Sequence, residues 1–214
     1  QKLTLKQGEK ISIPVKLVPN EGFKTNVQVV ALGGPTGLIP QTLTLTPGQG
    51  GNATLDAKGG APIAPGNYTI FLRGQTQAVN PKKPAPKGAP PNIVNYSMPV
   101  SVTIIPKQLG KFTATPATAK VSVGKEIEVT VKLARQYDLP LALKVEAILP
   151  PNVKGISAKD VTIKAGADEA KLTFTVAPNA TIGSTAMITL RATAMFNDTV
   201  PIVHETKVTL AIAK

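Results

Sequence analysis

The sequence contains no cysteine, and this absence removes several kinds of chemistry together. Disulfide frameworks, thiolate metal sites and Cys-based nucleophilic catalysis all require thiols. No apolar run approaches the roughly 18 residues that a membrane-spanning helix needs. The N-terminal stretch QKLTLKQGEK also lacks the apolar segment of a signal peptide. We therefore expect neither a disulfide scaffold nor a membrane span, and the redox compartment stays open.

Tryptophan is absent and aromatic residues make up only 4% of the chain, whereas positive charge is abundant. The net charge is +12, from 24 lysines and arginines against 12 carboxylates, and only Arg73, Arg135 and Arg191 are arginines. The electrostatic field of such a positive charge favours anionic partners in general. Nucleic-acid readers usually add arginine forks or aromatic platforms, so we expect no specific nucleic-acid binding. Lysine is expected instead to keep strand faces soluble and sheet edges unpaired.

Candidate catalytic and metal-binding groups are few. His204 is the single histidine, and no serine lies in a Gly-x-Ser-x-Gly elbow that would make it a nucleophile. We expect His204 to be an exposed or half-buried strand residue. Calcium needs several converging oxygens, and the nearest approach is Asp168-Glu169 in AGADEAK, which a solvated turn explains. The sequence therefore predicts no enzyme, no metal and no cofactor.

An internal repeat organises the chain. GEKISIPVKLV, from Gly8, aligns with GKEIEVTVKLA, from Gly124, at an offset of 116 residues. The pairs LTLTPG with VTIKAG and IFLR with ITLR follow at an offset of 118, and VSVTI matches VTLAI at 108. The order of these matches predicts two homologous units, residues 1–106 and 107–214, joined by the short connector Ile105 to Lys111.

Strict apolar–polar alternation inside each unit predicts strands with one buried face. In the first unit about seven strands are expected, near residues 2–6, 10–18, 26–32, 41–46, 52–57, 67–74 and 96–105. That number and spacing predict an all-β protein of two tandem immunoglobulin-like β-sandwiches, each of about seven antiparallel strands. A jelly roll or a small barrel is the alternative that the same strand pattern allows.

One stretch carries a resemblance to a known group of proteins. APIAPGNYTIFLRG, from Ala61, resembles the Pro-Gly-x-Tyr signature in bacterial immunoglobulin-like and fibronectin-III-like modules of secreted or surface proteins. The resemblance implies that the hydroxyl of Tyr68 bonds back to nearby backbone as a tyrosine corner. In the second unit Ala186 stands where the first has Tyr68, so a corner there must be held differently. Modules of this kind are mostly spacers, adhesive units or accessories beside a catalytic domain.

The segment 75–95, QTQAVNPKKPAPKGAPPNIVN, is the most unusual part of the chain. It corresponds to the shorter segment 193–203, so it is a Pro/Lys-rich insertion within the first unit rather than the linker between units. Its prolines favour an extended polyproline II conformation. Two interpretations remain open: the loop packs along a sandwich, or Lys82, Lys83 and Lys87 present a cationic finger to an anionic cell-envelope component or an acidic protein surface.

These observations favour a non-catalytic structural or adhesive spacer in a larger secreted or cell-surface bacterial protein, with the neighbouring domains of the same polypeptide as its partners. One alternative is an accessory region beside the catalytic domain of a secreted hydrolase. Another is a weak carbohydrate-binding module, which needs exposed aromatic rings. Tyr137, with Tyr96 and Phe196 near the loop bases, could supply such rings, whereas Phe71 and Phe174 are expected to face the core.

Overall fold

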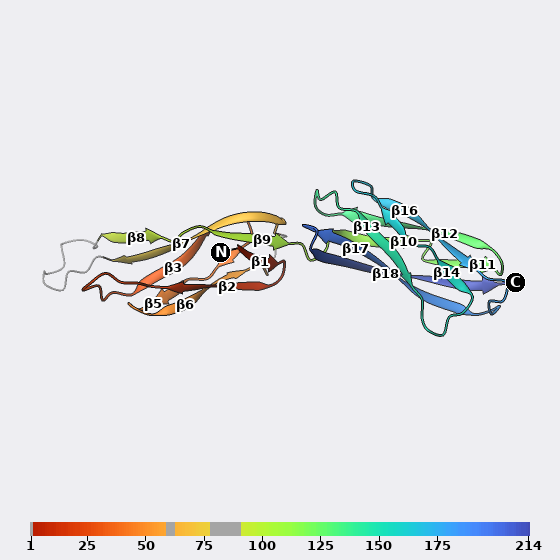
Figure 1. The fold of residues 1–214 in the computed structure, drawn as a ribbon, viewed down its shortest axis with the longest axis horizontal. Coiled ribbons are helices and arrows are strands. Elements are labelled where there is room, and N and C mark those ends of the chain that lie inside the picture. The colour runs from red at the N-terminus through yellow and green to blue at the C-terminus, as the bar shows by residue number, and fades with distance from the viewer. Residues whose placement is uncertain (1, 59–62, 78–90) are drawn as a thin grey trace. The chain divides into compact units, whose positions relative to one another are not determined.

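The structure, a computed structural model, describes residues 2–58, 63–77 and 91–214. All regular elements among these residues are β-strands, so the protein is all-β, as the alternation predicted. The chain forms two compact units, Gln1–Lys107 and Gln108–Lys214. Figure 1 shows that each unit consists of layered strands. The part of the chain that the structure describes contains no helix able to span a membrane.

The first unit packs a larger sheet against a smaller one. The larger sheet has the order β1 (Lys2–Lys6), β9 (Val100–Ile105), β7 (Gly66–Gln77), β3 (Val27–Gly33) and β5 (Leu43–Leu45), and β8 (Asn92–Tyr96) pairs with β7. The smaller sheet has the order β2 (Lys10–Lys16), β6 (Gly50–Asp56) and β4 (Ile39–Pro40).

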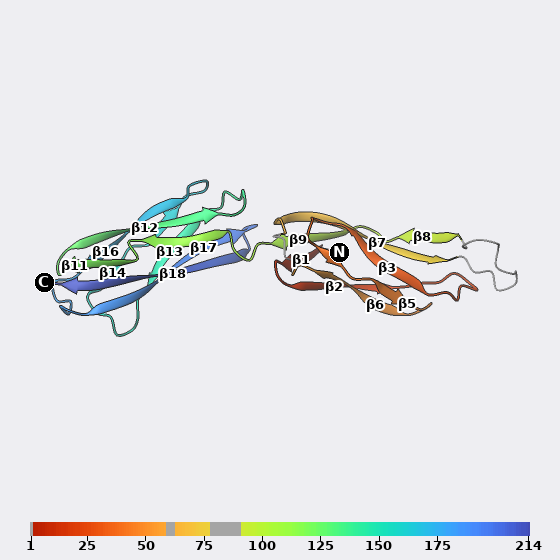
Figure 2. The same ribbon diagram turned by 180° about the vertical axis from the view of Figure 1, so that it is seen from behind.

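The second unit repeats this arrangement with one more edge strand. Its larger sheet has the order β11 (Thr118–Ser122), β18 (Val200–Ala213), β17 (Thr185–Phe196), β13 (Leu143–Ile148) and β15 (Val161–Ile163). Its other sheet has the order β10 (Gly110–Thr115), β12 (Glu126–Arg135), β16 (Glu169–Val176) and β14 (Ile156–Ala158). Figure 2 shows β17 and β18 running together through this unit.

Each unit has a parallel pair at its edge, so the expectation of purely antiparallel strands is wrong. β1 pairs with β9 in parallel from Lys2↔Ser101 to Lys6↔Ile105, and β11 pairs with β18 from Thr118↔Thr209 to Ser122↔Ala213. The reason is a tight turn after β1 and after β11 that sends the next strand into the opposite sheet. The short strands β1 and β11 are thereby left beside the last strands of their units, β9 and β18, and run in the same direction.

Each core is built from the inward-facing residues of the alternating strands. In β12 the side chains of Val129, Val131 and Leu133 are fully buried, and in β7 Ile70 and Leu72 face inward. Phe71 lies between those two and is 41% exposed, so the expectation that it faces the core is wrong. Successive side chains on a strand point to opposite faces, and the two aliphatic neighbours of Phe71 occupy the inner one. Phe174, by contrast, is fully buried as expected.

The ends of the insertion are more regular than its composition suggested. β7 continues to Gln77, and β8 begins at Asn92 and pairs with β7 from Gln77↔Asn92 to Arg73↔Tyr96. The expectation of a loop over the whole of 75–95 is therefore wrong at both ends. The stretch NIVNY supports this strand because Ile93 and Val94 are β-branched and Tyr96 is aromatic, residue types that favour strands.

Candidate functional site

The three lysines proposed as a cationic finger, Lys82, Lys83 and Lys87, lie outside the residues that the structure describes. Their role stays a prediction of the sequence.

Tyr68 lies on β7, one residue after Asn67. Its hydroxyl donates a hydrogen bond of 3.0 Å to the backbone carbonyl of Ala64, four residues earlier in the chain. Gly66, between them, has a φ of 149°, a region of backbone conformation that L side chains rarely adopt. The bond ties the segment that enters β7 to the strand itself, which is a structural role and not a catalytic one.

His204 lies on β18 and is only 4% exposed, so the expectation of an exposed or half-buried histidine is wrong. Its Nε2 accepts a hydrogen bond of 3.2 Å from the backbone N–H of Leu109, just before β10. Burial lowers the pKa of His204, because a charged imidazolium loses hydration there. A neutral ring that accepts this backbone hydrogen bond fastens the segment entering β10 to β18.

The aromatic residues considered for sugar stacking are scattered. Tyr96 on β8 is 59% exposed, whereas Phe196 at the end of β17 is buried and Tyr137 is half-buried in the loop after β12. Stacking on a pyranose requires an exposed ring face. Phe196 therefore cannot serve, and Tyr96 lies in the other unit from Tyr137, so the structure does not bring the proposed rings together in one unit.

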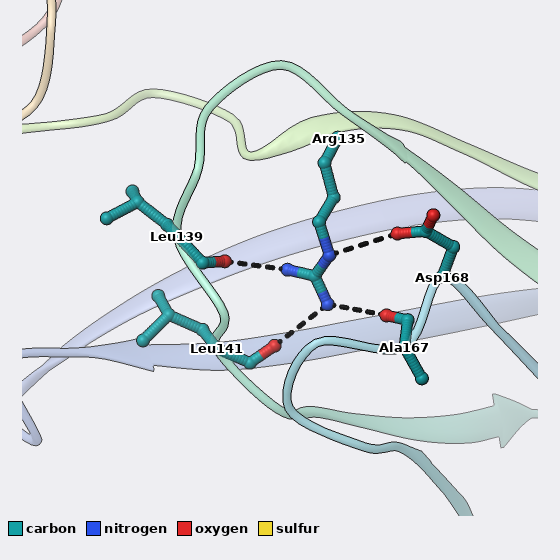
Figure 3. A network of polar contacts seen from close by, with 5 residues as sticks. All are labelled: Arg135, Leu139, Leu141, Ala167 and Asp168. Carbon is teal, nitrogen blue, oxygen red and sulfur yellow. Dashed lines mark hydrogen bonds and ion pairs between the residues drawn. The ribbon is translucent and has the colours of Figure 1, made fainter.

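Asp168 takes part in a network of polar contacts that fastens two loops. As Figure 3 shows, the guanidinium of Arg135 contacts Asp168 Oδ1 at 3.2 Å and donates to the carbonyls of Leu139 (2.8 Å), Leu141 (3.1 Å) and Ala167 (2.7 Å). One planar side chain at the end of β12 thus holds two loops. Within residues 2–58, 63–77 and 91–214, no group of three or more His, Asp or Glu side chains is placed to bind a metal.

The described residues of the first unit form an apolar groove with a volume of about 480 Å³. One wall comes from the end of β2 and the residues after it, including Val15, Leu17 and Phe23. The other comes from β7 and β8, including Leu72 and Ile93. We name this feature the β2–β8 groove. It lies at the edge of the sandwich and contains no charged side chain except Lys16.

Sequence reasoning did not find the β2–β8 groove. Two features of the sequence could have indicated it. One was the pair of β-branched residues Ile93 and Val94, in a stretch that was assigned to the loop 75–95. The other was GKFTAT in the second unit, whose first two residues were assigned to the connector. Both segments contain strands, β8 and β10. β8 forms one wall of the groove, and no described strand of the first unit takes the place that β10 has beside β12 in the second.

The similarities to solved structures reported below are distant ones. No protein-family model and no curated protein matches the chain. Among solved structures, domains 4 and 5 of the S-layer protein SbsC share 15% identity at a TM-score of 0.37, over 91% of this chain and 75% of that one. Rst D1-D2 shares 10% identity at a TM-score of 0.39, over 99% of this chain and 95% of that one.

The fibronectin(III)-like modules of Clostridium thermocellum CbhA share 14% identity at a TM-score of 0.33, over 99% of this chain and 89% of that one. Similarities this distant carry no functional argument.

Proposed function

We propose that the chain is a non-catalytic, load-bearing spacer made of two immunoglobulin-like β-sandwich units, within a larger secreted or cell-surface bacterial protein. The observation that carries this proposal is the parallel pairing of β1 with β9 in the first unit and of β11 with β18 in the second. Tension applied at the two ends of a unit pulls such strands past each other, along their length. All the ladder hydrogen bonds then resist together, because none can open before the others.

The tandem organisation supports the same function. Both units have the same order of strands in the larger sheet, and the chain passes from β9 to β10 through residues 106–109 alone. A load carried along the polypeptide enters the first unit at β1 and leaves it through β9. It enters the second unit at β10, reaches β11 next, and leaves through β18, the parallel partner of β11. The resemblance of the Tyr68 region to modules of secreted proteins agrees with this environment.

Single-molecule force spectroscopy tests the proposal. The β11–β18 ladder is bounded by the bonds from Thr209 N–H to Ala117 C=O (2.9 Å) and from Val123 N–H to Ala213 C=O (3.2 Å). By alternation, the N–H of Ala119 donates to β18 and the N–H of Lys120 points away. Ala119→Pro removes one ladder bond, worth about 1 kcal/mol at equilibrium. We expect it to lower the unfolding force of one unit, whereas Lys120→Pro has a smaller effect.

Changing the direction of pulling provides the control. β17 and β18 form an antiparallel pair from Thr185↔Ala211 to Phe196↔Val200. Attachment at Ser184→Cys and at the C-terminus pulls this pair apart from one end, so its bonds break in sequence. The unfolding force is expected to be clearly lower than for pulling from the two ends of the chain. Equal forces in the two geometries would show that the parallel pairs bear no special load.

The partners of the spacer are a separate part of the proposal. The positive charge and Lys82, Lys83 and Lys87 favour an anionic cell-envelope component or an acidic protein surface. Neighbouring domains of the same polypeptide would be the mechanical partners.

A further inference from the structure

The two units can be compared strand by strand, and the comparison exposes a difference at β2. β1 and β2 correspond to β11 and β12 at the offset of 116 residues. The turns between these strands match in their hydrogen bonds: Gly8 N–H donates to Ala57 (3.1 Å), and Gly124 N–H donates to Val176 (2.9 Å). β2 and β12 are therefore the same strand in two copies of one framework.

In the second unit β10 covers the outer edge of β12. The pairing runs from Gly110↔Arg135 to Thr115↔Thr130, and buried Phe112 lies opposite Leu133. Gly110 is needed at the start, because a Cβ there would collide with the carbonyl oxygen of Ala134. In the first unit β2 is an edge strand, and no described segment pairs with its outer side.

The uncovered edge leaves apolar side chains accessible. Val131 and Leu133 are fully buried under β10, whereas Val15 and Leu17, their equivalents, are only half-buried. The facing strand shows the same difference. Ile93 of β8 pairs with Thr76, as Ile202 of β18 pairs with Ala194 at the equivalent position, yet Ile93 is 50% exposed and Ile202 is 3% exposed.

These side chains line the β2–β8 groove. Its position between β2 and β8 is the position that β10 takes between β12 and β18, where Leu109 bonds to His204. Asn95 of β8 stands at the position that His204 has on β18. Asn95 pairs with Gly74 of β7, and His204 pairs with Ala192, the equivalent residue of β17. The groove therefore matches the site that β10 fills in the second unit. It lies at the same place in the framework, it is lined by apolar side chains, and it has a polar residue at one end.

The backbone of β2 is also oriented to accept a strand. Leu17 N–H donates inward to Gln49 (3.1 Å), as Leu133 N–H donates to Asp168 (2.8 Å). By alternation the N–H groups of Lys16 and Val18 face outward. Pro14 has no N–H to offer there. Its equivalent, Thr130, pairs with Thr115, the last residue of β10, so Pro14 lies where a covering strand ends.

We propose that the β2–β8 groove binds an extended peptide strand of β10-like chemistry, antiparallel to β2. Such a strand has glycine at its start, a large apolar residue two positions later, and a small residue after two more, as in GKFTAT. Its backbone pairs with Lys16 and Val18, and its apolar side chain covers Leu17 and Ile93. Strand addition of this kind uses main-chain hydrogen bonds for affinity and side-chain pockets for specificity. The inference does not depend on whether the units bear load.

A synthetic peptide with the sequence of residues 108–117, QLGKFTATPA, is the probe, added to the full chain and followed by backbone NMR. We expect the Lys16 and Val18 amide signals to shift in a saturable way, and their hydrogen exchange to slow by about tenfold or more, because both amides become hydrogen-bonded. Placing Asp at the Phe112 position of the peptide should weaken binding by about tenfold or more. A peptide that shifts only signals of the second unit would overturn the proposal.

Two matched pairs separate backbone pairing from unspecific apolar contact. Thr113 lies opposite Lys132 and its N–H faces β12, whereas the N–H of Phe112 faces away. N-methylation of the peptide at Thr113 should abolish binding, and N-methylation at Phe112 should preserve it. In the chain, Val18→Pro removes an outward N–H at an exposed position beyond the end of β2, and Val18→Ala keeps it. Equal effects within either pair would contradict strand addition.

The occupant is a peptide strand and not a second copy of this chain, and sedimentation of the peptide-free chain distinguishes the two. We expect a monomer over a wide concentration range, since the outward edge of β2 carries Pro14 and Lys16, residues that disfavour edge-to-edge pairing. A dimer that dissociates with Val18→Pro would overturn the proposal in favour of self-association.

Discussion

Arg135 illustrates at the residue scale how one side chain organises two loops. Its guanidinium contacts three carbonyls and one carboxylate from the segments that follow β12 and β15. A planar fork with five N–H donors can do this, whereas a lysine ammonium is a point charge on a flexible stem. The equivalent position in the first unit is Pro19, which lines the β2–β8 groove. The contacts by which Arg135 holds two loops are therefore specific to the second unit.

Arg135→Lys should lower the free energy of unfolding of the second unit by about 1–3 kcal/mol, because carbonyls in partly buried positions lose charged donors. Urea unfolding followed by circular dichroism measures the change. Arg191→Lys is the matched control, since Arg191 makes an exposed ion pair with Glu205 (2.8 Å) and should cost less than about 1 kcal/mol. Similar losses for the two variants would mean that the loop contacts of Arg135 contribute little.

His204 is the residue that sequence reasoning placed least well, although a signal was present. Ile202 is an apolar residue on the same strand, two positions earlier, and alternation puts residues i and i+2 on one face. The buried face of β18 therefore includes His204. Assigning a lone histidine to the surface followed the usual behaviour of polar residues. Here the backbone N–H of Leu109 supplies the partner that makes burial acceptable.

At the scale of elements, alternation predicted the strands with continuous apolar–polar patterns, such as β2, β12 and β16. It could not predict which strands pair, because a side-chain pattern carries no information on the direction of a neighbour. The parallel pairs β1–β9 and β11–β18 were missed for that reason. β10 was missed because its six residues adjoin the connector, and β8 because it adjoins a proline-rich stretch.

The attachment of β10 to β18 should depend on pH through His204. Its pKa in the folded chain is lowered by burial, so the unfolded state binds the proton more readily. Stability is then fully present above the ordinary histidine pKa of about 6.5 and is lost as the pH falls. Protonation also removes the acceptor for Leu109. Unfolding experiments between about pH 7 and pH 5 should show the second unit losing stability, by at most about 1.4 kcal/mol per pH unit.

His204→Gln is the control for this effect, because glutamine offers an acceptor at a similar reach and does not titrate. The pH dependence in that window should largely disappear with this variant, since the chain has only one histidine. An unchanged pH dependence in the variant would assign the effect to carboxylates.

At the scale of the whole molecule, the two units share a framework but differ in how completely the core is covered. Val131 and Leu133 are fully buried, and their equivalents Val15 and Leu17 are not. Full burial of one such side chain contributes about 1.5–3 kcal/mol, so half-burial at two positions forfeits roughly 1–3 kcal/mol. We expect the first unit to be the less stable one.

Native-state hydrogen exchange on the full chain measures this difference directly. Ile70 and Ile188 are equivalent core positions on β7 and β17, both fully buried. The opening free energy at the Ile70 amide should be lower than at the Ile188 amide by a few kcal/mol. Equal protection at the two amides would contradict the prediction and would show that the groove costs the first unit no stability.

The parallel pair at the edge of each unit also has a consequence for biosynthesis. Lys2 of β1 pairs with Ser101, and Thr118 of β11 pairs with Thr209, so each of these early strands meets its parallel neighbour only at the end of its unit's sequence. Pairing between such distant segments is intrinsically slow to form. During synthesis a unit cannot close until its last strand has left the ribosome. Until then, the apolar faces of its earlier strands stay accessible to chaperones or to misassembly with the neighbouring repeat.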